Sequence, residues 1–145
     1  MWVQAHCGIF KLKVSLEEGI YRVFAIHGND TLENLAEYIL HVFKFDCDHA
    51  YGFYDNDYNE VYELFHDLNM DSWAGAKGVK KTLIQDVFQP KKQMIFLFDY
   101  GDEWNFLVEC MSIGEVITKQ KYPKLLEKLG RAPKQYAGYD DKMCK

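Results

Sequence analysis

Two aspartates and a histidine are the residues best suited to chemistry in this sequence. Asp99 and Asp102 flank Gly101 in a short segment that ends at Trp104, and His49 follows an acidic stretch earlier in the chain. Carboxylates this close can share a proton or bind a hard cation, and a histidine can act as their acid–base partner. Asp99, Asp102 and His49 are therefore candidate catalytic groups of a small metal- or carboxylate-dependent hydrolase.

A structural interpretation explains the same residues. Aspartate side chains accept hydrogen bonds from the amides of tight turns, so Asp99 and Asp102 fit a hairpin turn around Gly101. Trp104 would then pack as the first inward residue of the returning strand, and His49 would hydrogen-bond a carboxylate of the turn. We favour the turn and assign no catalytic residue, so an enzyme is the less favoured class.

Three other motifs fall short of the metal or phosphate sites that they imitate. Cys47 and His49 offer two ligands, whereas zinc needs three or four in convergent geometry. The acidic turn at 55–59 begins like an EF-hand loop, but Glu60 stands where that loop requires glycine. Residues 75–82 contain the glycines, lysines and threonine of a phosphate loop at the wrong spacing. We therefore expect no metal site and no cofactor.

Basic residues gather near the end of the chain. Residues 119–145 hold eight Lys or Arg and three Asp or Glu, although the whole chain has a net charge of −5. Cations such as Lys124, Lys128 and Arg131 can neutralise nucleic-acid phosphates without reading sequence. The isoelectric point of about 5.5 argues against this, because a nucleic-acid-binding domain is typically above ~9. A solvated basic helix is the simpler explanation.

The scaffold for these residues is predicted to be a single α+β domain. The 145 residues are 48% hydrophobic and 16% aromatic, enough for one substantial core. Residues 9–16 alternate between apolar and polar side chains, which predicts a strand, and Gly19 supplies the turn into a second strand at 20–26. A capping box at 30–33 opens a helix over 31–44, whose apolar residues recur with helical periodicity.

The rest of the chain adds strands and two short helices. We predict strands near 50–54, 60–66, 93–99 and 103–113, a surface loop at 67–81, a tight turn at 100–102, and helices near 82–88 and 123–129. The sheet should be mostly antiparallel (mixed), with a β-hairpin–α–β order that is β-grasp-like. The domain should span 1–145, with a core at about 9–133 and a loose tail at 134–145.

Location is predicted from what the sequence lacks. No stretch approaches the ~18 apolar residues of a membrane span, and the first seven residues do not resemble a signal peptide. The four cysteines form no CxxC pair. We therefore expect a cytoplasmic protein with free thiols and no membrane association.

Five stretches carry a resemblance to a known family: Leu12–Leu16, Tyr21-Arg22, Thr31–Leu35, Asp48–Phe53 and Phe98–Trp104. Together they resemble the Ri-plasmid ORF-3-like family, whose members are also described as TnpR-like passenger proteins of a mycobacterial insertion sequence. The resemblance covers residues 9–138 and implies an α+β domain, sometimes carried on plasmids or insertion elements, with no established activity.

The sequence departs from the family pattern at several places. Tyr21 and Phe45 stand where tryptophan is usual, and Phe106 stands where a histidine commonly follows the hairpin tryptophan. The acidic, cysteine-bearing and glycine-rich tail motif of the family is reduced here to the segment at 132–139, which has no acidic residue and no cysteine. These losses weaken the case for a polar active site.

A non-enzymatic binding or interaction module is the function that we favour, with its partner unidentified. Exposed aromatics near Tyr51, Tyr54, Tyr58 and Tyr62 would offer a surface for a protein partner. The candidate binding residues are Trp104, Tyr51, Lys124, Lys128 and Arg131. The alternatives are the hydrolase described above and a mobile-element accessory protein that contacts nucleic acid through its basic C-terminal segment.

Overall fold

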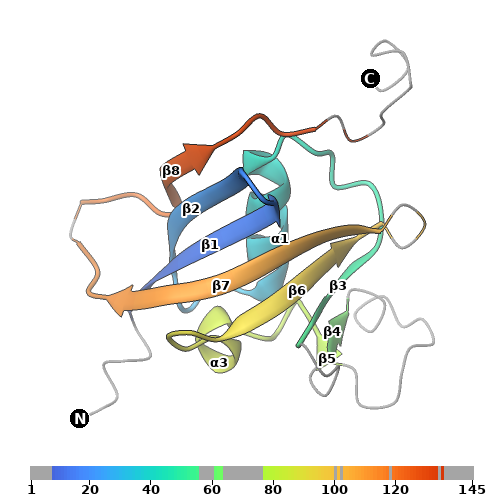
Figure 1. Ribbon diagram of the computed structural model, residues 1–145. Coiled ribbons are helices and arrows are strands. Elements are labelled where there is room, and N and C mark those ends of the chain that lie inside the picture. The colour runs from blue at the N-terminus through green and yellow to red at the C-terminus, as the bar shows by residue number, and fades with distance from the viewer. Residues whose placement is uncertain are drawn as a thin grey trace.

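An eight-stranded sheet and two helices make up the described part of the chain (Figure 1). The computed structural model describes residues 8–55, 61–63, 77–99, 101, 103–117, 119–133 and 135. Its elements are β1 (Ile9–Glu17), β2 (Ile20–His27), α1 (Leu32–Val42), β3 (Tyr51–Tyr54), β4 (Val61–Glu63), β5 (Lys77–Gly78), α3 (Ile84–Val87), β6 (Gln93–Phe98), β7 (Trp104–Gly114) and β8 (Lys124–Leu129).

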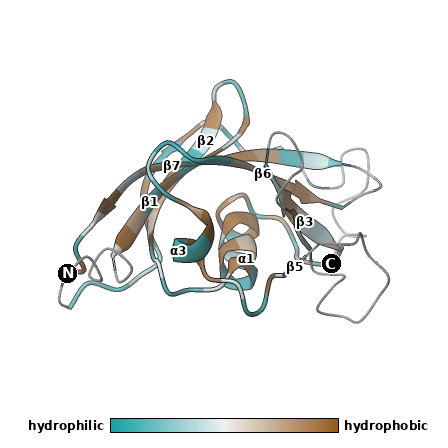
Figure 2. Cartoon of the chain, turned by 90° about the horizontal axis from the view of Figure 1, so that it is seen from below, coloured by the Kyte–Doolittle hydropathy of each residue, from teal (hydrophilic) through white to brown (hydrophobic). Residues whose placement is uncertain are grey.

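The strands lie in the order β5-β4-β3-β6-β7-β1-β2-β8. Every neighbouring pair is antiparallel except β4 and β5. Figure 2 shows both helices on one side of the curved sheet, where they enclose the core. The α+β class and the mostly antiparallel sheet are therefore confirmed. The likeness to a β-grasp rests on the order β1-β2-α1-β3 alone, since both sheet neighbours of β1 are antiparallel to it.

The first hairpin forms as its alternation predicts. The inward residues Phe10, Leu12 and Val14 are at most 1% exposed. Gly19 adopts a φ of 86° between the strands, a conformation that glycine takes at little cost. A second hairpin, β6–β7, places Phe96 opposite Phe106 within the same core.

Helix α1 begins one residue later than expected and is capped differently. Thr31 is the N-cap, and its hydroxyl accepts a hydrogen bond from the amide of Asn34 at 3.1 Å. The capping box with Glu33 is therefore wrong, because the cap shifts from Asp30 to Thr31. Helix α3 likewise starts after Leu83, while the Thr82 hydroxyl donates to the carbonyl of Gly78.

Strand β5 was missed because residues 77–78 lie in the predicted surface loop. They pair in parallel with β4, whose described residues fall within the predicted strand at 60–66. Residues 56–59 of the predicted turn at 55–59, and most of that loop, lie outside the described residues.

The predicted helix at 123–129 is wrong, since residues 124–129 form strand β8. The strand pairs antiparallel with β2, from Tyr21 opposite Leu129 to Ala25 opposite Lys124. A β-bulge interrupts the ladder between Val23 and Phe24. The outer edge of β2 carries backbone N–H and C=O groups that need partners, and satisfying them outweighs a weak local preference for helix.

Among the described residues, no helix is both long and apolar enough to cross a bilayer.

Candidate functional site

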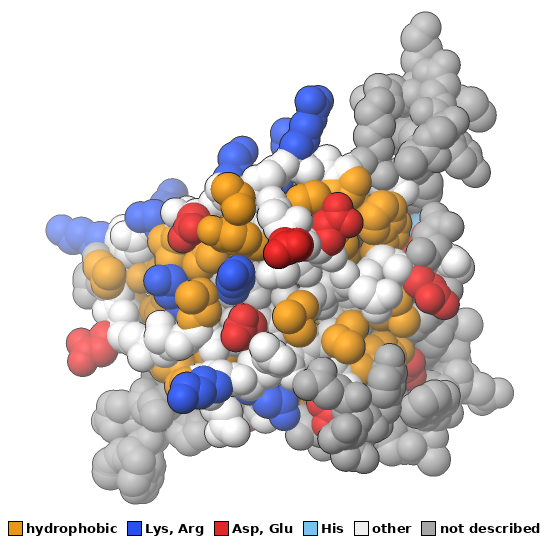
Figure 3. Space-filling model, in the orientation of Figure 1, with side chains coloured by type: hydrophobic (Ala, Val, Ile, Leu, Met, Phe, Trp, Pro, Cys, Tyr) orange, Lys and Arg blue, Asp and Glu red, His pale blue; other side chains and the backbone are white. Residues whose placement is uncertain are grey.

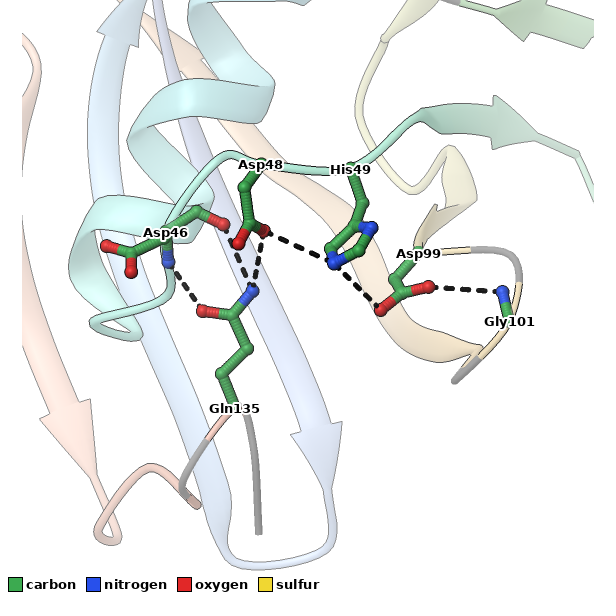
Figure 4. A network of polar contacts seen from close by, with 6 residues as sticks. All are labelled: Asp46, Asp48, His49, Asp99, Gly101 and Gln135. Atoms are coloured by element: carbon green, nitrogen blue, oxygen red, sulfur yellow. Dashed lines mark hydrogen bonds and ion pairs between the residues drawn. The ribbon is translucent and has the colours of Figure 1, made fainter. Parts of the chain in front are cut away.

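A small polar network gathers where the segment after α1 meets the β6–β7 turn (Figure 4). His49 Nε2 lies 3.5 Å from Asp99 Oδ2 and 3.6 Å from Asp48 Oδ1. The His49 side chain is 40% exposed and that of Asp99 is 11% exposed. His49 thus contacts a carboxylate of the turn at ion-pair distance, where a hydrogen bond was predicted. Asp102, the third member of the proposed catalytic cluster, lies outside the described residues.

Asp99 holds the turn together. Its Oδ1 accepts a hydrogen bond from the Gly101 amide at 3.1 Å, and its backbone carbonyl accepts one from the Glu103 amide at 2.6 Å. Its own amide donates to the carbonyl of Ala50 at 2.9 Å. A φ of 65° places Asp99 in the left-handed region, which Asp and Asn tolerate better than most residues. The carboxylate that could serve chemistry is therefore used by the backbone around it.

Gln135 anchors the chain after β8 to the same network. Its Oε1 accepts from the Asp46 amide at 2.6 Å, while its Nε2 donates to the Asp46 carbonyl at 3.1 Å and to Asp48 Oδ1 at 3.2 Å. Gln135 is only 9% exposed, although it was predicted to belong to a loose tail. A side-chain amide can accept from the N–H and donate to the C=O of one residue at once, so this contact closes a tight clasp.

The predicted aromatic contact surface is wrong where it is described. Tyr51, Tyr54 and Tyr62 are 2%, 5% and 5% exposed, so they belong to the interior, and Tyr58 lies outside the described residues. Trp104 is half-buried against Phe45, with ring centroids 4.9 Å apart. Its indole Nε1 is buried and has no hydrogen-bond partner in the structure.

The environment of Cys47 does not favour a metal. Partial desolvation raises the pKa of its thiol, and the carboxylates of Glu37, Asp48 and Glu33 raise it further. A metal ligand must be a thiolate, which a raised pKa disfavours. Within the described ranges, no three His, Cys, Asp or Glu side chains gather closely enough to hold an ion.

A cationic hollow lies on a different part of the surface, where the chain after β8 passes the end of α1 near the top of Figure 1. Its volume is about 790 Å³. It is lined by Arg22, Val42, Phe43, Lys44, Lys128, Gly130, Arg131, Ala132 and Pro133. Four of these residues are cationic and none is acidic. We call this site the cationic hollow.

Arg22 lines the cationic hollow and is 4% exposed. Its Nη1 donates to the carbonyls of Tyr21 and Leu129 at 2.8 and 3.0 Å, and its Nε donates to the carbonyl of Val42 at 3.2 Å. The guanidinium also lies 4.8 Å from the centroid of the Phe43 ring. Burial lowers the pKa of Arg22. Within the described residues, no carboxylate forms an ion pair with it.

Strand β8 divides the predicted basic residues between the two faces of the sheet. Lys128 pairs with Arg22 and Lys124 with Ala25. Arg22 and Ala25 are three residues apart on one strand, so their side chains point to opposite faces, and cross-strand partners share a face. Lys128 and Arg131 therefore meet at the cationic hollow and Lys124 does not. Sequence reasoning missed Arg22 and Lys44. Arg22 alternates with Phe24 and Ile26 along β2, so its side chain points to the same, inward face. A charged residue at an inward position was the signal in the sequence that could have identified it.

A second hollow lies on the face of the sheet away from the helices. It has a volume of about 570 Å³, and Lys13, Tyr21 and Leu107 are among its lining residues. The Tyr21 hydroxyl donates to Glu127 Oε2 at 2.6 Å, and the Lys13 ammonium lies 4.5 Å from the Tyr21 ring centroid. Figure 3 shows hydrophobic side chains on this face scattered among both kinds of charge. Glu17 and Glu18 line this hollow together with Lys13, so it is not a cationic site.

Comparison with known proteins identifies the family. The model of the plasmid pRiA4b ORF-3-like proteins matches residues 8–140. The chain belongs to this family. Comparison with curated proteins gives no match. Among solved structures, the pRiA4b ORF-3-like fold seen here is similar to that of MM3350, a protein of unknown function from Methanosarcina mazei Go1. The two are 19% identical, with a TM-score of 0.74 over 84% of this chain and 70% of the other. At this identity the likeness concerns the fold alone.

Proposed function

We propose that this plasmid pRiA4b ORF-3-like protein is a non-enzymatic binding module formed by a single domain. The observation that carries the proposal is that Asp99 is engaged in hydrogen bonds within the β6–β7 turn. Its carboxylate braces the Gly101 amide, and its main chain joins the Ala50 carbonyl to the Glu103 amide. Catalytic groups need a substrate position within hydrogen-bond reach. Neither of the two hollows described above includes Asp99 or His49 among its lining residues.

Hydrolysis is the second candidate, because His49 Nε2 lies 3.5 Å from Asp99 Oδ2. A histidine beside a carboxylate is a common acid–base arrangement. The pair lacks a nucleophile among the described residues that contact it, however, and Asp99 is bound by the turn.

An esterase and phosphatase assay separates the two candidates. The full-length protein, His49→Ala and Asp99→Asn would be tested with chromogenic phosphate and carboxyl esters, with and without added Mg²⁺ or Zn²⁺. We expect no turnover above the buffer blank for any of them. Turnover by the unmodified protein that disappears in both variants, while their circular dichroism spectra stay unchanged, would refute the binding-module proposal.

The nucleic-acid alternative loses support from the position of β8. On a helix, Lys124 and Lys128 would occupy neighbouring positions of one face, four residues apart. On the strand they point to opposite faces of the sheet. A continuous basic surface along this segment is therefore not what the geometry supports, and a local anion site around Lys128 replaces it.

A further inference from the structure

Arg22 is a buried cation without a carboxylate partner in the described part of the chain. Burying an unpaired charge is costly, and folded proteins normally match such a charge with an anion or with hydrogen bonds. Three carbonyl oxygens satisfy Nε and Nη1. The remaining nitrogen, Nη2, makes no hydrogen bond to a described residue, although it is not sealed from solvent in the way that Trp104 Nε1 is. Its two N–H groups are available to a ligand in the cationic hollow.

Three more cations complete the cationic hollow. Lys44, Lys128 and Arg131 come from the end of α1, from β8 and from the segment after it, and all three are exposed. Lys44 follows α1 with a φ of 64°. Within the described residues, none of the three forms an ion pair. Like charges repel when they are gathered around one space, so the arrangement is stabilised by an anion placed between them.

We propose that the cationic hollow binds a compound that carries phosphoryl groups. A phosphate presents several oxygen atoms in a tetrahedral arrangement and can accept from a guanidinium and two ammonium groups together, which a single carboxylate cannot do as well. The hollow has a volume of about 790 Å³. This volume exceeds the space that one phosphate fills and lies within the ~300–1,000 Å³ of ordinary small-molecule sites.

The lining suggests how such a ligand lies. Its phosphates would be held by the four cations, with Arg22 Nη2 as the deepest donor. Val42, Ala132 and Pro133 provide an apolar wall for an organic group attached to the phosphates. This inference rests on the proposed function, because the cationic hollow holds cations without a nucleophile and general base to transform what it binds.

Isothermal titration calorimetry with pyrophosphate and with ATP tests the inference on the full-length protein. The variants are Lys128→Ala, Arg131→Ala and the matched control Lys124→Ala, which removes a lysine from the same strand but outside the cationic hollow. We expect saturable binding that Lys128→Ala and Arg131→Ala each weaken by about three- to tenfold, the loss expected for one charge-assisted contact. Lys124→Ala should change the affinity by less than about twofold, because an exposed charge that does not line the cationic hollow is screened from the ligand by salt.

Arg22→Lys distinguishes hydrogen bonding by the Arg22 guanidinium from the effect of its positive charge alone. It keeps one positive charge but loses the donors of the guanidinium group, so we expect weaker binding of pyrophosphate and ATP. Its urea midpoint would be measured in parallel, because Arg22 also supports the fold. The two exposed variants, Lys128→Ala and Arg131→Ala, keep the inference testable if Arg22→Lys does not fold.

The outcomes distinguish the inference from the proposed function. No binding of either probe, or an equal loss in Lys124→Ala, would overturn the phosphate site and leave the binding module in search of another ligand. Binding of a short single-stranded DNA with the same variant pattern would support the site and assign its phosphates to a nucleic-acid backbone. Release of orthophosphate from a bound probe would support the site and refute the non-enzymatic role.

Discussion

Replacing Arg22 with methionine tests the role of this buried cation in the fold. Methionine keeps much of the volume of the side chain but removes three hydrogen bonds, which join the carbonyls of Tyr21, Val42 and Leu129. Hydrogen bonds from a charged donor contribute about 1.5–3 kcal/mol each. Two effects reduce the total: the variant no longer buries a charge, and water from the cationic hollow can reach the freed carbonyls. We expect a net loss of about 2–4 kcal/mol of unfolding free energy.

Urea denaturation followed by circular dichroism measures this loss. The midpoint should fall while the slope stays constant, because the surface exposed on unfolding hardly changes. Lys124→Met is the matched control, since the side chain of Lys124 is exposed on β8 and makes no hydrogen bond or ion pair to a described residue. It should change the stability by no more than about 0.5 kcal/mol. An Arg22→Met variant as stable as this control would show that the contacts of Arg22 do not hold β8 to α1.

Three further predictions concern the polar network and a buried thiol. Asp99→Ala should cost about 1–2 kcal/mol in urea denaturation, whereas Asp99→Asn, which keeps an acceptor for Gly101 and tolerates positive φ, should cost under about 0.5 kcal/mol; equal losses would contradict the turn role. Gln135→Ala should speed hydrogen exchange at the Asp46 amide by about tenfold, and unchanged exchange would contradict the clasp. Burial raises the pKa of Cys110 to about 11, so at pH 8 this thiol should be alkylated about a hundredfold more slowly than a free one. Rapid alkylation of Cys110 in the native protein would contradict the raised pKa. The unfolded thiol loses its proton first, near pH ~8.5. The stability that Cys110 contributes should therefore fall as pH rises from there to about 11.

Patterns within a short segment of sequence predicted the strands and the helix that depend mainly on that segment. The hairpin of β1 and β2 follows from its alternation and from Gly19, and α1 follows from a stripe of apolar residues with helical periodicity. The contact between His49 and Asp99 was also predicted. The register explains it, because Tyr51 lies opposite Phe98 and the residues just beyond that pair must be neighbours.

Strand β8 could not be predicted in the same way. The proline just before it, the leucines spaced four apart and the closing Gly130 all favour a helix when they are considered alone. The deciding partner is the edge of β2, about a hundred residues earlier in the chain. Only the tertiary fold brings that edge to the segment, and six exposed side chains give no pattern that would distinguish an edge strand from a solvated helix.

The same error hid the cationic hollow. Gly130 adopts a φ of 81° after β8 and lies so close to the β1–β2 turn that a Cβ atom would overlap the backbone oxygen of Gly19. This close approach lets the chain turn across the end of α1, where Arg131 meets Lys44, before Gln135 clasps the segment beyond the helix. Because no two of the four cations lie on the same regular element, their convergence depends on this path. The cationic hollow is thus a consequence of pairing β8 with β2, and a substitution at Gly130 that weakens the turn should weaken phosphate binding without removing any cation.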